Sequence, residues 1–207
     1  MNLILNECKG SYGRDNLTKI IRAQKQQKDK IKGVLKLGFS SDPLIRWVFP
    51  DPNIYLVNFD TWMEEFSKIS FSNDVVFAEE NFYGASIWHP PGFEFDETCL
   101  YPTLEWMTEE RIEFVSQFFE EFSNYHPDDA WYLAFIGVDP SKQGLGVGSF
   151  ILKEALKTID ERGERAYLES SNPRNMSLYE RHGFESMGKV QIGDSPPAHP
   201  MIREPRK

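Results

Sequence analysis

The sequence predicts a mixed α/β domain built from two or three layers of secondary structure. Three observations support this fold class: two β-rich runs flank Glu80–Asn81, a continuous apolar run covers residues 131–138, and residues 147–162 follow with helical spacing. Strand and helix patterns that alternate in this way are typical of a sheet covered by helices. The 207 residues contain no internal repeat and no long Pro-, Gly- or Ser-rich linker, so we expect a single domain.

Helical patterns dominate the N-terminal third of the chain. Residues 15–33 predict a polar helix, and residues 58–69 predict a second helix because their apolar side chains are spaced three or four apart. Between them, the Ser-Ser-Asp-Pro sequence from Ser40 and the Phe-Pro-Asp-Pro sequence from Phe49 are typical of turns. We therefore expect two helices joined by a turn-rich connector.

The remaining elements alternate between strands and helices. The β-rich runs predict a hairpin over residues 75–88. Residues 103–125 carry an apolar stripe at helical spacing, and Gly163 is placed to end the helix predicted over residues 147–162. The last predicted elements are a strand over residues 166–169, a helix over 174–181 and a strand pair from Phe184 onward.

Composition restricts the possible classes of function. The formal net charge of −9 disfavours binding to nucleic-acid backbones and is compatible with a cationic amine substrate. Cys8 and Cys99 are too few for a disulfide framework and lack metal-site spacing, so we expect a reduced, cytoplasmic setting and no metal. No apolar run reaches the roughly 18 residues of a membrane span, and residues 1–7 do not resemble a secretory leader.

Three alternating glycines form the most informative local feature. Gly144, Gly146 and Gly148 lie between the predicted strand over residues 131–138 and the helix that follows it. Glycine lets the backbone approach a ligand closely, and free N–H groups at a helix start bind anions such as a pyrophosphate. The dinucleotide G-x-G-x-x-G fingerprint has a different spacing, and the P-loop requires a lysine that this segment lacks. A glycine-rich turn without a ligand is the remaining alternative.

Two motifs resemble one known family. Gln143-Gly-Leu-Gly-Val-Gly resembles the Gln/Arg-x-x-Gly-x-Gly/Ala motif of the GNAT superfamily of N-acetyltransferases. The segment Tyr167 to Phe184, which ends in Tyr-Glu-Arg-His-Gly-Phe, resembles the second motif of that family. Within the family, residues 131–184 are most similar to the puromycin N-acetyltransferase-like branch.

The resemblance implies an overall organisation. It implies acetyl-coenzyme A as the acyl donor, without a metal, and a central, mixed, mostly antiparallel sheet with helices on both faces. Residues 75–204 would form the cofactor-binding core of one domain spanning residues 1–207. Residues 1–74 match the family poorly and would form the variable acceptor-side part, in which Met1–Leu5 is a meagre candidate for the opening strand.

The resemblance also implies which residues bind the cofactor. The backbone of Ile136 and Val138 would pair with the pantetheine arm, and a splayed strand at Ile136–Gly137 would open its slot. An N–H group near Gly137 and Val138 would stabilise the oxyanion that forms on the thioester. Asn175 would contact the pantetheine, with Asn172 as a second candidate. The pyrophosphate would be held by N–H groups of Gln143, Gly144, Leu145, Gly146, Val147, Gly148 and Ser149.

Tyr179 and Glu169 are the candidate catalytic residues. On the same resemblance, the Tyr179 phenol would protonate the leaving thiolate, or would only pack against the pantetheine. An aliphatic ammonium with a pKa of about 10 must lose a proton before it attacks, and Glu169 would accept that proton. Glu169 could equally be a structural partner of a nearby N–H group. The alternative bases are Glu79, Asp139, His89 and His126, whereas His182 is expected to cap a helix or lie at the surface.

The expected reaction is a direct attack of an amine on the thioester in a ternary complex. No Ser-His-Asp or Cys-His arrangement supports an acyl-enzyme. A small-molecule primary amine is the first candidate acceptor. The aromatic residues Phe39, Trp47 and Tyr55 would either form an acceptor wall that suits an apolar or ring-bearing amine, or pack against the central sheet. The alternatives are a peptide N-terminus or lysine as acceptor, a longer acyl group, and a non-catalytic sensor of acyl-coenzyme A. We expect a monomer or homodimer, with no nucleic-acid or membrane partner.

Overall fold

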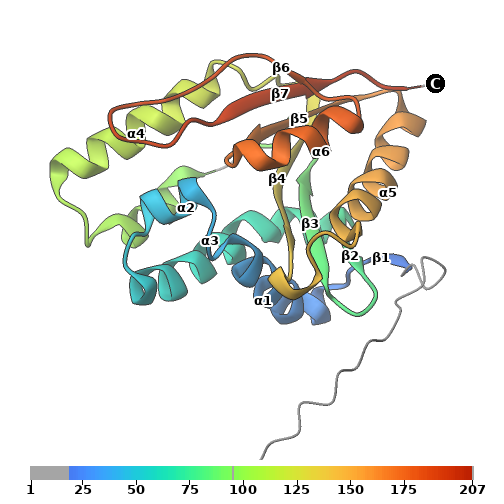
Figure 1. The fold of residues 1–207 in the computed structure, drawn as a ribbon, viewed down its shortest axis with the longest axis horizontal. Coiled ribbons are helices and arrows are strands. Elements are labelled where there is room, and N and C mark those ends of the chain that lie inside the picture. Colours follow the sequence, from blue (N-terminus) through green and yellow to red (C-terminus); the bar gives the residue numbers. More distant parts are fainter. Residues whose placement is uncertain (1–18, 95, 207) are drawn as a thin grey trace, which may run out of the picture.

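A single twisted sheet forms the centre of the computed structural model, which describes residues 19–94 and 96–206 (Figure 1). Within these residues the sheet has seven strands in the order β1-β2-β3-β4-β5-β7-β6. All neighbouring strands are antiparallel except β4 and β5, which are parallel. The strands are β1 (Ile20–Arg22), β2 (Val76–Glu79), β3 (Gly84–His89), β4 (Ala130–Val138), β5 (Arg165–Ser170), β6 (Glu185–Ser186) and β7 (His199–Arg203).

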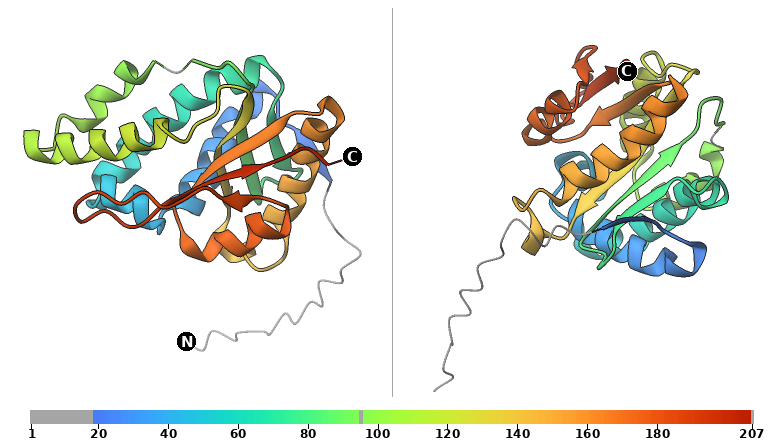
Figure 2. Two further views of the ribbon diagram at one scale, coloured as in Figure 1. Left: turned by 90° about the horizontal axis from the view of Figure 1, so that it is seen from above. Right: turned by 90° about the vertical axis from the view of Figure 1, so that its right-hand side faces the viewer.

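Helices cover both faces of this sheet (Figures 1 and 2). On one face lie α1 (Lys28–Phe39) and α3 (Pro52–Ser72), and on the other lie α5 (Val147–Arg162) and α6 (Met176–Arg181). The mixed α/β fold with a mostly antiparallel sheet and helices on both faces is thereby confirmed. The other helical segments are α2 (Pro43–Val48), α4 (Glu109–Ser123) and the 3-10 helices η1 (Lys25–Gln27), η2 (Glu97–Leu104), η3 (Pro140–Lys142) and η4 (Pro173–Asn175).

Three apolar clusters hold the layers together, and each buried large side chain stabilises the fold by roughly 1.5–3 kcal/mol. The first lies between the sheet, α1 and α3, and includes Leu35, Phe59, Met63 and Phe135. The second lies between the sheet, α5 and α6, and includes Trp88, Leu133, Ile151 and Leu168. The third joins α2 and α4 to the β6–β7 connection through Leu44, Phe118, Phe122, Val190 and Ala198.

The prediction of a polar helix over residues 15–33 is wrong in part. Residues 20–22 form β1, which pairs with β2 at the sheet edge, and α1 begins only at Lys28 and continues to Phe39. A three-residue edge strand is stabilised by its neighbour, so the local pattern carries little signal for it. Residues 15–18 and the candidate opening strand Met1–Leu5 lie outside the described residues.

The turn-rich connector is also corrected, because both of its Asp-Pro pairs start helices. Asp42 caps α2 by accepting hydrogen bonds from two backbone N–H groups at 3.1 Å each, and Asp51 caps α3 in the same way. Proline occupies the first helical position after each cap. The helix expected over residues 58–69 therefore begins at Pro52. Likewise, α4 begins at Glu109 rather than at residue 103, because Thr108 caps it.

Apart from the start of α4, the elements from β2 onward agree with their predictions. The hairpin occupies β2 and β3, the apolar run forms β4, and the helix over residues 147–162 is α5 with the same bounds. Gly163 ends α5 in a left-handed conformation with φ of 69°. The described helices include none that combines the length and the apolar content required to cross a membrane.

Candidate active site

β4 and β5 separate near the middle of the sheet. Their parallel pairing runs from Ala130 and Arg165 to Leu133 and Leu168 and ends there. β4 continues to Val138 alongside β3. Beyond Leu133, β4 therefore has a strand partner on one side only among the described residues. The predicted splayed strand is confirmed, and its opening leaves backbone groups of β4 available to a ligand that lies along it as an added strand.

Helix α1 packs closely against the open end of β4. A Cβ atom at Gly38 would lie 3.0 Å from the backbone nitrogen of Val138 and 3.1 Å from the Cα atom of Gly137. Conversely, a Cβ atom at Gly137 would lie 3.1 Å from a methyl group of Leu35. Both glycines are needed because the two backbones approach too closely for side chains between them. The free end of β4 is thus supported by α1.

The glycine turn at the start of α5 provides an anion-binding geometry. Gly144 and Gly146 have φ angles of 78° and 85°, which are left-handed values that favour glycine. The first hydrogen bond of the helix runs from the Phe150 N–H to the Gly146 carbonyl at 3.1 Å. The N–H groups of residues 146–149 donate to no acceptor within the described ranges. Such a row of free donors at a helix start fits a pyrophosphate.

Side chains around this turn connect it to its neighbours. The Gln143 amide donates to the Val138 carbonyl at 3.3 Å, which joins the turn to the end of β4. The Ser149 hydroxyl lies 2.7 Å from the Nε2 atom of His182 at the end of α6. This contact was missed in the sequence, where His182 was expected only to cap a helix or lie at the surface. Its partner lies in another helix, so no local pattern indicates the pair.

The two asparagines differ in how their side chains are engaged. The side-chain Oδ1 atom of Asn172 accepts a hydrogen bond from the Arg174 N–H at 3.1 Å. Asn175 is exposed, and its side chain makes no hydrogen bond to the described part of the chain. The Asn175 amide is therefore the one that is available to a ligand.

Glu169 lies at the fork between β4 and β5. It is the first residue of β5 after Leu168, the last residue of β5 that pairs with β4. The half-buried Glu169 carboxylate accepts hydrogen bonds from the hydroxyls of Tyr132 at 2.9 Å and Tyr167 at 3.2 Å. Burial raises the pKa of Glu169 to about 7, against the opposing effect of these two hydrogen bonds. Its observed partners are thus two phenols and not an N–H group.

Tyr179 lies on the other face of the sheet, in α6. Its side chain is buried in the apolar cluster beneath α5. Burial, and after it the nearby Asp42 carboxylate, raises the pKa of the Tyr179 phenol well above its ordinary value. The Tyr179 hydroxyl has no hydrogen-bond partner among residues 19–94 and 96–206. The phenol is therefore protonated and free to donate a hydrogen bond.

Most of the alternative bases have structural roles. The buried Glu79 carboxylate accepts the N–H groups of Asn81 at 3.0 Å and Tyr83 at 3.1 Å in the β2–β3 turn. Asp139 accepts the Ser141 N–H at 2.8 Å, and its hydrogen bonds with that residue lower its pKa. The Nε2 atom of His89 lies 2.8 Å from the Phe66 carbonyl, and burial lowers the pKa of His89 to about 4.

Among the alternative bases, His126 contacts both tyrosines that hold Glu169. Its ring centroid lies 4.9 Å from the ring centroids of both Tyr132 and Tyr167, which contact the carboxylate. Burial lowers the pKa of His126, so this residue is neutral at physiological pH. In the part of the chain that the structure describes, no group of three His, Cys, Asp or Glu side chains is placed to hold a metal ion.

The three aromatic residues expected to form an acceptor wall are not together. Phe39 stacks on Phe59 and Phe135 in the first apolar cluster, with ring centroids 5.6 and 5.5 Å away. Tyr55 is buried in the same cluster, and its hydroxyl donates to the Lys36 carbonyl at 2.5 Å. Trp47 alone lines an open pocket. Of the two roles left open by the sequence, Phe39 and Tyr55 therefore have the packing role.

Comparison with known proteins agrees with this geometry. Residues 87–184, which include β4, the glycine turn, Glu169 and Tyr179, match the model of the acetyltransferase (GNAT) family. This segment of the chain resembles the GNAT family. The matched residues include both motifs noted in the sequence, residues 143–148 and 167–184. The resemblance to the puromycin N-acetyltransferase-like branch stays a prediction.

Individual relatives resemble this chain over part of their length. An uncharacterized N-acetyltransferase of Schizosaccharomyces pombe is 30% identical in an alignment 144 positions long, which covers 60% of this chain and 58% of that protein. Mycothiol acetyltransferase of Thermomonospora curvata is 36% identical over 81 residues, or 38% of this chain and 27% of that enzyme. The chain thus spans less than two thirds of the curated relatives it matches.

A solved structure shows the same fold over nearly the whole chain. A Corynebacterium glutamicum protein described as histone acetyltransferase HPA2 and related acetyltransferase superposes with a TM-score of 0.66 at 22% identity. The superposition covers 92% of this chain and 97% of that one. At this identity the likeness concerns the GNAT fold alone.

Proposed function

We propose that this protein transfers the acetyl group of acetyl-coenzyme A to the primary amine of a small molecule by direct attack in a ternary complex. One observation carries the proposal: Glu169 and Tyr179 lie on opposite faces of the sheet beside the β4–β5 separation. Successive residues of a strand point to opposite faces, and Leu168 packs with Tyr179 whereas Tyr167 contacts Glu169. A base on one face and an acid on the other suit a transfer through the gap.

The cofactor-binding part of the proposal uses backbone groups. The N–H groups of residues 143–149 would hold the pyrophosphate, and the backbone of Ile136 and Val138 would hold the pantetheine together with the Asn175 amide. Acetyl-coenzyme A supplies the activated thioester. An N–H group near Gly137 and Val138 would stabilise the negative charge that develops on the thioester oxygen. In this proposal residues 75–204 bind the cofactor and residues 1–74 form the acceptor side.

The proton transfers follow from the two side chains. Glu169 removes a proton from the acceptor ammonium, and the resulting amine nitrogen attacks the thioester carbon. The carbon–sulfur bond breaks, and Tyr179 donates its proton to the departing sulfur. The nitrogen then loses its second proton, which returns through solvent to the Tyr179 phenolate, and Glu169 releases its proton to solvent. The acetylated amine and free coenzyme A are the products. The sparse cysteine content supports a cytoplasmic location for this reaction.

The proposal is tested by measuring free-thiol release from acetyl-coenzyme A with a panel of primary amines and short peptides. Turnover with small amines is the expected result. Tyr179→Phe should lower kcat about 10- to 100-fold, since it removes the proton donor, while calorimetry detects little change in acetyl-coenzyme A affinity. An equal loss of turnover and affinity would assign Tyr179 to packing. Binding of acetyl-coenzyme A without turnover of any acceptor would instead indicate a sensor.

A further inference from the structure

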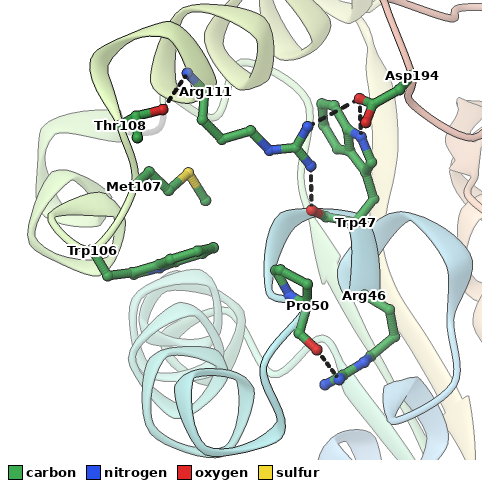
Figure 3. A pocket seen from close by; sticks show the side chains of 8 residues that line it. All are labelled: Arg46, Trp47, Pro50, Trp106, Met107, Thr108, Arg111 and Asp194. Carbon is green, nitrogen blue, oxygen red and sulfur yellow. Dashed lines mark hydrogen bonds and ion pairs between the residues drawn. The ribbon is translucent and has the colours of Figure 1, made fainter.

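An open pocket of about 610 Å³ lies outside the site described above (Figure 3). Its wall combines three segments that are distant in the sequence: the end of α2 with the residues after it, the start of α4 with the turn before it, and the β6–β7 connection. Trp47 and Pro50 come from the first segment, Trp106 and Arg111 from the second, and Asp194 from the third.

Helix α2 connects this pocket to the proposed catalytic centre. Its N-terminal cap, Asp42, accepts a hydrogen bond at 2.6 Å from the hydroxyl of Ser171, which follows β5 two residues after Glu169. Its other end carries Arg46 and Trp47 in the pocket wall. A helix of six residues is about 9 Å long, so the pocket lies on the order of 10 Å from the end of β5.

The aromatic wall of the pocket is fixed by its own contacts. The Trp47 indole N–H donates to Asp194 at 2.8 Å. The Arg111 guanidinium lies 4.1 Å from the centroid of the Trp47 ring and donates to Asp194 at 3.0 Å and to the Trp47 carbonyl at 2.6 Å. Trp106, whose side chain is 36% exposed, faces this group across the opening (Figure 3). A wall held rigid in advance loses little entropy when a ring binds against it.

The two arginines of the pocket wall differ in their partners. Asp194 neutralises Arg111, and hydrogen bonds from Trp47 and then Arg111 lower the pKa of Asp194. Arg46 donates to the Pro50 carbonyl at 2.5 Å and lies 5.2 Å from the Tyr55 ring centroid. No carboxylate pairs with Arg46 in the described parts of the chain. Its remaining N–H donors are suited to a carboxylate of a ligand.

We infer that this pocket binds the far end of the acceptor, and that this end is an aromatic ring carrying a carboxylate. The ring lies between Trp47 and Trp106, and the carboxylate pairs with Arg46. The inference rests on the proposed function for the other end of the acceptor, where the amine reaches Glu169. The acceptor is therefore an elongated primary amine with on the order of 10 Å between its amine and its acidic ring.

Calorimetry with indole-3-propionate tests the pocket without requiring turnover, because this probe has the ring and the acid but no amine. We expect binding to the full chain, weakened about tenfold by Arg46→Met, which removes a charge-assisted contact, and by Trp106→Ala, which removes one wall. Arg162→Met is the matched control, since Arg162 also stacks on a tryptophan, 5.1 Å from the Trp131 ring centroid, but lies in α5. Its affinity for the probe should equal that of the wild type.

A second measurement separates this inference from the proposed function. In the thiol-release assay, indole-3-propionate should inhibit competitively against the amine acceptor and leave the KM for acetyl-coenzyme A unchanged. No detectable binding, equal affinity in Arg46→Met and wild type, or inhibition that the acceptor does not relieve would each overturn the inference. In all three cases turnover of other amines would leave the proposed function intact.

Discussion

Glu169 is subject to two opposing influences that together set its pKa. Burial beside β4 disfavours the charged carboxylate, whereas the hydroxyls of Tyr132 and Tyr167 stabilise it by hydrogen bonding. The resulting pKa of about 7 lies well above that of an ordinary carboxyl group. A carboxylate of ordinary pKa, about 4.3, would be a much weaker base toward an ammonium.

The pH dependence of turnover should report this ionisation. Because the base acts only when deprotonated, kcat/KM should rise with pH through about 7 and fall in acid. Glu169→Gln should abolish this ionisation and lower kcat on the order of 100-fold. The measurement is thiol release across the pH range. A rise that persists unchanged in Glu169→Gln would exclude Glu169 as the base.

Tyr132→Phe should displace the same ionisation. Removing a hydrogen bond that stabilises the carboxylate raises the pKa of Glu169, so the midpoint should move to higher pH by on the order of one unit. The exposed Tyr101, changed to Phe, provides the control and should leave the midpoint in place. A shift to lower pH, or none, would show that Tyr132 does not tune the base.

Residues of the site differ in how far the sequence reveals them. Glu169 and Tyr179 are predicted from one continuous segment, Tyr167 to Phe184. Tyr132 was not, because it stands within an apolar run that predicts only a buried strand. Its hydrogen bond to Glu169 depends on the parallel pairing of two strands separated by a whole helix. Local patterns contain no record of that pairing.

At the scale of elements, the start of α5 carries the proposed anion site. Gly146→Leu should weaken acetyl-coenzyme A binding at least about tenfold, measured by calorimetry, because its side chain would fill the space intended for phosphate. Its φ of 85° adds strain of roughly 1–3 kcal/mol, and a Cβ atom there would lie 3.3 Å from the Phe150 ring.

Gly163→Ala is the matched control for that substitution, since it lies at the other end of the same helix. Gly163 has a similar φ of 69°, so alanine incurs comparable backbone strain. Its position faces open space among the described atoms and lies at the opposite end of α5 from the glycine turn. Gly163→Ala should therefore lower the melting temperature without changing affinity. If Gly146→Leu bound acetyl-coenzyme A as tightly as the wild type, the glycine turn would not be the phosphate-binding site.

Helix α1 offers a second pair of glycines with opposite expected effects. Gly38→Ala should destabilise the protein, because its methyl group would lie 3.0 Å from the backbone nitrogen of Val138. Gly33→Ala should stabilise it by roughly 0.5–1 kcal/mol, since alanine favours helix and the described atoms leave this position open. Urea unfolding measures both. Equal destabilisation of the two variants would show that α1 does not rest on β4.

The elements that were mispredicted show where local patterns are ambiguous. An Asp-Pro pair is typical of a turn, but it is equally typical of a helix start with Asp as cap and Pro in the first position. Asp42 and Asp51 are both of the second kind. Strong and long periodic patterns, such as those of β4 and α5, left no such ambiguity and were predicted closely.

At the scale of the whole molecule, the separation of β4 from β5 weakens the sheet where the site requires an opening. Only four residue pairs join these two strands. Other contacts must therefore connect the two parts of the sheet. Helix α5 packs against β2, β3, β4 and β5 together, and the Ser171–Asp42 hydrogen bond ties the end of β5 to α2. The β4–β5 gap is stable because α5 and the Ser171–Asp42 hydrogen bond connect the two parts of the sheet across it.

The Arg203–Asp160 ion pair fastens β7 to α5 and should contribute most among these polar ties. Arg203 is 3% exposed, donates to both Asp160 oxygens at 2.7 and 2.8 Å, and also donates to the His182 carbonyl at 2.8 Å. Arg203→Met would remove both side-chain hydrogen bonds to the partly buried Asp160 carboxylate, which keeps only the one from the Arg206 N–H, so the free energy of unfolding should fall by about 1–3 kcal/mol. Urea unfolding at neutral pH measures this loss.

Arg165→Met is the control, and acid provides an independent test. Arg165 pairs with the exposed Asp129, so its loss should cost less than about 1 kcal/mol. Although burial alone would raise the pKa of Asp160, hydrogen bonds from Arg203 and the Arg206 N–H hold it below its ordinary value. A lowered carboxyl pKa stabilises the fold above the unfolded-state pKa of about 3.9, and that stabilisation is lost as the pH falls through the folded-state value. The difference in the free energy of unfolding between Arg203→Met and wild type should therefore shrink in acid. If this difference were constant with pH, packing of the Arg203 side chain, rather than its charge, would hold β7 in place.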